Sequence, residues 1–149
     1  MKYPIYCTYL LLLTIMCTTA KAQNSSKPKL FSSFPDKISC TNAELGKVFS
    51  IAANQNAGLR FSDNFSFDGV VTSNVVKYAN LQSVVIRSAA YDGAIFVLSK
   101  ITENGTVNYV GRIINTKYFD GYELKQDAQG NYQFLKIETG RVIQDCSQP

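Results

Sequence analysis

The sequence contains no histidine among its 149 residues. This absence excludes Ser–His–Asp and Cys–His catalysis, and it excludes zinc sites that depend on imidazole ligands. The sequence also lacks a phosphate-binding P-loop and a dinucleotide-binding glycine fingerprint. The commonest sequence signatures of enzymes are therefore missing, and we expect a protein without catalytic activity, cofactor or bound metal.

Carboxylates are the remaining candidates for catalysis. Asp120 and Glu123 are close in sequence, but three positions along a strand place two side chains on opposite faces. Residues 63–69 begin like a calcium loop, yet Phe65 and Phe67 stand at the third and fifth ligand positions and offer no side-chain oxygen. A small carboxylate-dependent hydrolase is accordingly kept only as a second alternative.

Long hydrophobic runs are absent except at the N-terminus. Lys2 supplies a positive start, residues 5–16 are apolar, and residues 20–22 (AKA) place small side chains where signal peptidase cleaves. The pattern predicts a signal peptide over residues 1–22, cleaved before Gln23, and a secreted or periplasmic protein. The apolar run is short for a membrane span, and no second run is long enough to cross a bilayer.

A lipid anchor on Cys17 is the alternative fate of this N-terminal segment, because a lipid would tie the protein to a membrane. Lipoprotein signals carry small residues before the modified cysteine. Thr14, Ile15 and Met16 are bulky at these positions. We therefore expect release of the chain rather than anchoring.

A concentrated block of basic residues is also absent. The formal net charge is +4, from 15 Lys and Arg against 11 Asp and Glu. Lys2 and Lys21 leave with the signal peptide, so the mature chain carries +2. Interspersed charges of both signs are not the electrostatic pattern of a nucleic-acid-binding protein. We expect no nucleic-acid partner.

Cleavage leaves two of the four cysteines, Cys40 and Cys146. They lack C-x-x-C spacing and have no histidine neighbours, so redox or metal chemistry is not indicated. An even number of cysteines in an oxidising compartment favours a structural bridge. The sequence predicts a Cys40–Cys146 disulfide, whose loop of roughly a hundred residues would contribute about 4–5 kcal/mol in the chain-entropy model.

The mature chain reads as one domain with a short leader. Residues 23–37 are expected to be a flexible leader or extended arm, and residues 38–149 a single α+β domain. Thr41 to Glu44 fits a capping box, and apolar residues at helical spacing follow it. Together they predict a helix from Asn42 to Asn56.

Beyond Gly58 the hydrophobic period changes to two, which is typical of strands. Turn signals recur about every dozen residues, and Asn104-Gly105 is the strongest of them. No second helix is predicted between the strands, so the order is antiparallel. We expect one N-terminal helix packed on a twisted antiparallel sheet of six to seven strands, with a small β-barrel carrying one helix as the alternative.

This element order resembles the cystatin-like arrangement, in which a curved sheet wraps one helix. Residues 82–86 (QSVVI) begin like the inhibitor motif Q-x-V-x-G, but Ile86 stands where glycine must allow a tight turn. The resemblance therefore implies the layout and not protease inhibition. The signal ending in AKAQ and the short β-rich domain also resemble small uncharacterised secreted proteins of Bacteroidota, which implies no activity.

Four residues are candidates for a binding surface, since Tyr and Arg are favoured at binding hot spots. They are Tyr109, Arg112, Tyr118 and Tyr122. Ordinary cross-strand pairing, with tyrosine hydroxyls in water, is the competing interpretation.

The expected function is a non-catalytic binding domain for a protein, glycan or small ligand outside the cytoplasm. The main alternative is an inhibitor of a secreted hydrolase. An inhibitor would present a protruding loop, at Asp92-Gly93 or at Asn104-Gly105.

Overall fold

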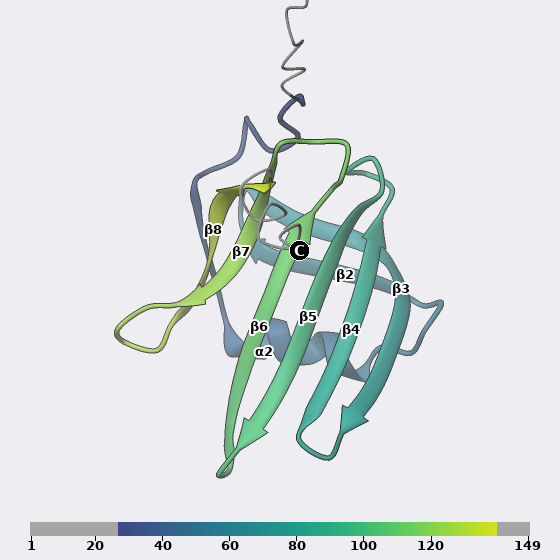
Figure 1. Ribbon diagram of the computed structural model, residues 1–149, viewed down its shortest axis with the longest axis vertical. Helices are drawn as coiled ribbons and strands as arrows, with labels where there is room; N and C mark the ends of the chain where they lie inside the picture. Colours follow the sequence, from purple (N-terminus) through teal and green to yellow (C-terminus); the bar gives the residue numbers. More distant parts are fainter. Residues whose placement is uncertain (1–26, 140–149) are drawn as a thin grey trace, which may run out of the picture.

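The computed structural model describes residues 27–139, which form one antiparallel sheet and a short helical segment (Figure 1). The predicted signal peptide and Cys146 lie outside the described residues. The sheet has eight strands: β1 (Lys37–Cys40), β2 (Asn56–Ser62), β3 (Phe65–Tyr78), β4 (Leu81–Ser88), β5 (Ala94–Glu103), β6 (Thr106–Ile114), β7 (Asp120–Gln126) and β8 (Tyr132–Glu138).

The strands form a meander that closes almost completely on itself. Their order is β1-β8-β7-β6-β5-β4-β3-β2, and all neighbours are antiparallel. β1 pairs with β8 at one edge of the sheet and also contacts β2 at the other. The sheet is therefore a nearly closed barrel, with the long strands β3 to β6 side by side in Figure 1.

The predicted cystatin-like layout is wrong. A six- to seven-stranded sheet wrapped on an N-terminal helix was expected, but there are eight strands and β1 precedes the helix. β1 pairs with the distant β8, from Lys37 opposite Leu135 to Cys40 opposite Tyr132. This pairing rolls the sheet onto itself instead of onto a helix. The alternative, a small barrel with one helix, fits the structure.

The helix is shorter than the predicted segment from Asn42 to Asn56. Helix α2 (Asn42–Lys47) continues as a 3-10 turn, η2 (Val48–Ser50), and Ile51 is already extended. In Figure 1 the helix lies behind the long strands. The apolar stripe that predicted a long helix is therefore divided between a helix, a 3-10 turn and extended chain.

Side chains of the barrel end the helical segment. Asn74 Nδ2 donates to the carbonyl oxygens of Phe49 and Ile51 at 3.1 and 2.8 Å. Gln82 Nε2 donates to the same Phe49 carbonyl at 3.2 Å. The last carbonyls of a helix need partners from outside it. Here side chains of β3 and β4 supply them. The helical segment therefore ends where it meets these strands, and the chain continues into β2.

The start of the helix combines a predicted contact with an unexpected one. Thr41 Oγ1 accepts from the backbone N–H of Glu44 at 3.1 Å, as a capping box requires. The Glu44 carboxylate does not reach back to Thr41. Its Oε1 accepts from the backbone N–H of Arg60 at 3.0 Å, and its Oε2 from Lys47 Nζ at 2.8 Å. Glu44 thereby ties the helix to the edge of β2.

Aromatic side chains fill the barrel. Five of them, from β3, β5, β7 and β8, are fully buried: Phe65, Phe67, Phe96, Tyr122 and Phe134. Their neighbouring ring centroids lie 5.5–6.5 Å apart in tilted or edge-on pairs, the favoured arrangement for aromatic side chains. The interior is thus a packed core.

A segment of residues 28–36, which we call the arm, covers this core at the end where β7 begins. Phe31 is fully buried, with its ring centroid 5.4 Å from that of Tyr91 and 5.3 Å from that of Tyr122. The backbone N–H groups of Leu30 and Phe31 donate to the Asp120 carboxylate at 2.6 and 2.9 Å. The arm is therefore anchored by both apolar packing and a buried charge.

Candidate functional site

The four residues predicted to form an aromatic and cationic surface do not share one surface. Tyr109 and Tyr122 pack with the core. Arg112 is exposed on the outside of β6, and Tyr118 lies in the loop between β6 and β7. Tyr109 and Arg112 are three positions apart on one strand, which places them on opposite faces.

The two tyrosines that point inward, Tyr109 and Tyr122, contact other residues of the fold. The Tyr122 hydroxyl donates to the carbonyl oxygen of Pro35 at 2.7 Å, and burial raises its pKa. Tyr109 stacks on Phe49 with ring centroids 5.9 Å apart, and burial followed by the nearby Tyr132 raises its pKa. Both phenols therefore stay protonated and contribute to packing.

Arg112 belongs to a charged cluster on the outside of β6 and β7. Its Nε and Nη2 donate to Glu123 Oε1 at 3.1 and 2.8 Å, and Lys125 Nζ lies 2.9 Å from Glu123 Oε2. Burial alone would raise the pKa of Glu123, but the hydrogen bonds from Lys125 and Arg112 outweigh it and lower that pKa. Glu123 is thus held ionised between two cations.

The outward side chains of β3 to β6 form a continuous apolar surface, which we call the outer face. The pairing register and the pleat place nine Val, Leu and Ile side chains there. They are Val70, Val75, Leu81, Val85, Ile95, Val97, Ile101, Val110 and Ile114. Val75 and Val110 are half-exposed, at 50% and 57%. Apolar side chains therefore meet solvent across four adjacent strands.

The polar groups on the outer face are few and specific. Ser83 and Ser99 lie opposite each other near its centre, and their hydroxyls hydrogen-bond at 2.8 Å. Cross-strand pairing arranges the outward side chains in rows. From the row that contains Val70 to the row that contains Leu81, the outer face has two charged side chains, Arg87 and Arg112. Between these two rows no acidic side chain stands among the paired outward positions of the described strands; Glu103 lies beyond the row of Leu81, opposite Thr106. The outer face is therefore apolar and mildly basic between these rows, with an acidic residue beyond them.

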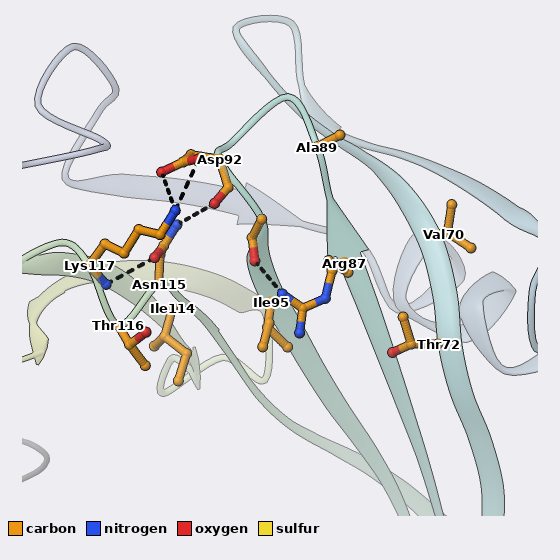
Figure 2. A pocket seen from close by; sticks show the side chains of 11 residues that line it. Val70, Thr72, Arg87, Ala89, Asp92, Ile95, Ile114, Asn115, Thr116 and Lys117 are labelled. Atoms are coloured by element: carbon orange, nitrogen blue, oxygen red, sulfur yellow. Dashed lines mark hydrogen bonds and ion pairs between the residues drawn. The ribbon is translucent and has the colours of Figure 1, made fainter.

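A hollow of about 750 Å³ lies at the end of the outer face near the loop between β4 and β5 (Figure 2). Val70, Ile95 and Ile114 line it with apolar side chains, and Arg87 and Lys117 bring cationic groups to it. An apolar lining with a few polar groups is typical of ligand-binding sites. The hollow thus combines an apolar lining with two cationic side chains and the carboxylate of Asp92.

Two loops tied together form one side of the hollow, as the dashed lines in Figure 2 show. Lys117 Nζ lies 3.2 Å from Asp92 Oδ2, and Asn115 Nδ2 donates to the Asp92 carbonyl at 3.0 Å. Arg87 Nη1 donates to the carbonyl of Gly93 at 3.2 Å and has no carboxylate partner within the part of the chain that the structure describes. The charge of Lys117 is therefore balanced by Asp92, whereas the charge of Arg87 is free to pair with a bound acidic group.

The two turns considered for an inhibitory loop are short. Asp92 and Gly93 have positive φ values of 51° and 80°, and Asp92 is fixed by Lys117. Asn104 and Gly105, at 49° and 78°, make a two-residue turn between β5 and β6. Neither segment extends as a long loop from the barrel.

The candidate carboxylates do not converge. Asp120 is buried with its oxygens on the amides of Leu30 and Phe31, whereas Glu123 lies outside the barrel with Arg112. Among residues 27–139, no group of three or more Asp, Glu, Cys or His side chains is arranged to hold a metal ion. The structure offers no pair of free carboxylates at these positions.

The outer face was not identified from the sequence, although a signal for it was present. Residues 94–101 (AIFVLSKI) are apolar at successive positions. Such a pattern is typical of a central strand covered on both faces. In the barrel only one face of β5 is covered, so the same pattern indicates exposed apolar side chains.

Within the described residues, no helix has the length and apolarity needed to cross a membrane. Comparison with known proteins finds no matching family, curated protein or solved structure.

Proposed function

We propose that this chain is a non-catalytic binding domain, secreted or periplasmic, which contacts its partner through the outer face of β3 to β6. The single observation that supports this is the group of Val, Leu and Ile side chains on that face. The strand register places them outward, and several of them are exposed to solvent. Extended exposed apolar surfaces on soluble domains mark interaction sites or cause aggregation.

The apolar residues of the outer face are not needed to fill the core. The interior already holds fully buried aromatic rings from β3, β5, β7 and β8. Exposed β-branched residues on four adjacent strands therefore stabilise the fold mainly by cross-strand contacts, which threonine could also provide. Their apolar character is explained by contact with a partner.

The charge of the outer face suggests the chemistry of that partner. Arg87 lies at the hollow without a carboxylate partner among the described residues, and the nine apolar residues adjoin it. A partner should present apolar side chains together with at least one acidic group. Complementary charge of this kind sets orientation and association rate.

A matched pair of variants tests this function. Val110 lies on the outer face of β6, and Val107 lies on the same strand with the opposite parity. They are 57% and 42% exposed. The exported protein, immobilised as wild type, Val110→Glu or Val107→Glu, is incubated with the envelope and secreted fractions of the producing cell. Bound proteins are quantified by mass spectrometry, and circular dichroism checks each fold.

We expect a partner that wild type and Val107→Glu retain and Val110→Glu loses by about tenfold or more. A captured hydrolase whose activity falls on binding would favour the inhibitor alternative within the same proposal. Equal capture by all three proteins would overturn the role of the outer face.

A further inference from the structure

We infer that a second copy of this chain binds the outer face, forming a dimer with two-fold symmetry. This inference rests on the proposed binding role of that face and names its partner. Three features support it: the area of the face, the paired serines at its centre, and the positions of opposite charges at its two ends.

The area is close to what a specific dimer requires. Four strands spaced about 4.8 Å apart are about 19 Å wide, and seven residues rising about 3.4 Å each are about 24 Å long. One copy thus offers roughly 450 Å² of flat sheet area, and two copies together bury roughly 900 Å². The additional surface of protruding side chains is not included in this figure. Stable interfaces begin near 1,000 Å² in total. A dimer that dissociates on dilution is therefore expected.

The centre of the outer face can be buried without an unpaired polar group. Ser83 and Ser99 satisfy each other through their hydroxyl contact at 2.8 Å, and Ser83 is already 7% exposed. Burial of a polar group is costly chiefly when it lacks a partner. The flanking residues Val97 and Val110 are exposed and can pack against apolar residues of the outer face of another copy.

Opposite charges stand at equal distances from this centre. Arg87 is opposite Ile95, four residues along β5 from Ser99. Glu103 lies four residues from Ser99 in the other direction, and strand parity places it on the same face. Glu103 is exposed and makes no ion pair with another described residue. One end of the outer face is therefore positive and the other negative.

A two-fold axis uses both charges. If the axis lies in the interface and crosses the strands at the level of Ser83 and Ser99, the strands of the two copies run in opposite directions. Arg87 of each copy then faces the end that carries Glu103 of the other. The contact occurs twice, because a two-fold interface uses the same surface on both copies. Sheets packed face to face with nearly aligned strands are a common arrangement.

Charge reversal combined with mixing tests the dimer. The full chain is exported with its own leader and studied by sedimentation over micromolar to millimolar concentrations. The variants are Arg87→Glu and Glu103→Arg, with Asp63→Arg as a control, since the Asp63 side chain is 97% exposed and outside the outer face. Circular dichroism establishes that each variant is folded.

We expect wild type and Asp63→Arg to dimerise with increasing concentration. Arg87→Glu and Glu103→Arg alone should each weaken the dimer about tenfold or more, because like charges then face each other twice. An equimolar mixture should regain it, since in the mixed dimer both contacts join Glu to Arg. High salt should reduce the difference.

A wild type that stays monomeric at millimolar concentration overturns the dimer, and so does a mixture that stays as weak as its components. The proposed binding role stands in either case if Val110→Glu still abolishes capture of another partner. If Val110→Glu changes neither dimerisation nor capture, both proposals are overturned.

Discussion

Oδ2 of Asp120 accepts a hydrogen bond from the backbone N–H of Phe31 at 2.9 Å, although 89 positions separate the two residues in the chain. Oδ1 accepts in the same way from the backbone N–H of Leu30 at 2.6 Å. Because Asp120 is buried at the start of β7, it fixes the arm against the aromatic core. One carboxylate therefore supplements the apolar packing of Phe31 in attaching the arm.

Replacement of this carboxylate should loosen the arm. In Asp120→Asn the amide group can accept at one oxygen only, so one buried N–H loses its acceptor. We expect the free energy of unfolding to fall by about 2–3 kcal/mol, the usual scale for hydrogen bonds to a charged group. Urea unfolding measures the loss, and hydrogen exchange should quicken at Leu30 and Phe31. Asp63→Asn is the control, and equal stability of the two variants would contradict the prediction.

Gly121 permits close contact between β6 and β7. A Cβ atom on this residue would lie 2.5 Å from the carbonyl oxygen of Ile113. Gly121→Ala should therefore displace one strand and lower the free energy of unfolding by about 1–3 kcal/mol, the scale of overpacking. Gly58→Ala is the matched control, because its Cβ would meet only the side-chain Oδ1 of Asp68 at 3.1 Å. Thermal unfolding of the two variants compares them; a larger loss in Gly58→Ala would count against this interpretation.

Glu44 should make stability depend on pH. The hydrogen bond from Lys47 is the main cause that lowers its pKa in the folded protein. A group with a lowered folded pKa stabilises the protein above its unfolded value, about 4.3 for Glu, and this contribution is lost as pH falls through the folded pKa. Wild type should therefore lose more stability than Glu44→Gln between about pH 6 and pH 3.

Urea midpoints at several pH values measure this difference. Lys47→Met keeps the Glu44 carboxylate but removes the main cause of its lowered pKa. This variant should also lose less stability than wild type on acidification. Parallel acid losses in wild type and in both variants would show that Glu44 does not contribute.

The Cys40–Cys146 disulfide stays a prediction that can be measured directly. Cys40 is buried at the end of β1, and burial raises the pKa of its thiol to about 12. Under oxidising conditions Cys146→Ser should lower the free energy of unfolding by up to about 4 kcal/mol. Reductant should remove the difference between wild type and variant. Two free thiols in denatured, oxidised wild type would exclude the bridge.

Local patterns predicted the hairpins because their causes are local. Asn104 and Gly105 adopt the positive φ values of 49° and 78° that an Asn-Gly turn requires. The period of two on either side of this turn also depends on nearby residues alone, so it predicts the flanking strands. The predicted helix was too long because its end depends on Asn74 and Gln82, which reach it from other elements.

Barrel closure could not be predicted, because it depends on pairing between β1 and the distant β8. The start of β2 differs from the prediction for a related reason: the predicted helix runs to Asn56, whereas pairing with β3 makes Asn56 the first residue of a strand. Among the candidate site residues, parity alone would have separated Tyr109 from Arg112. Recognition of the outer face required knowing that a single side of β5 is covered.

The bond between Glu44 and the backbone of Arg60 has a consequence for aggregation. Edge strands with free N–H groups are templates for the strands of other chains, and natural proteins protect them with charge or with a covering element. Glu44 does both at β2, since it occupies an amide of that strand and brings a negative charge to it. A strand from another molecule would have to displace this carboxylate, so the seam of the barrel is protected against fibril-like growth.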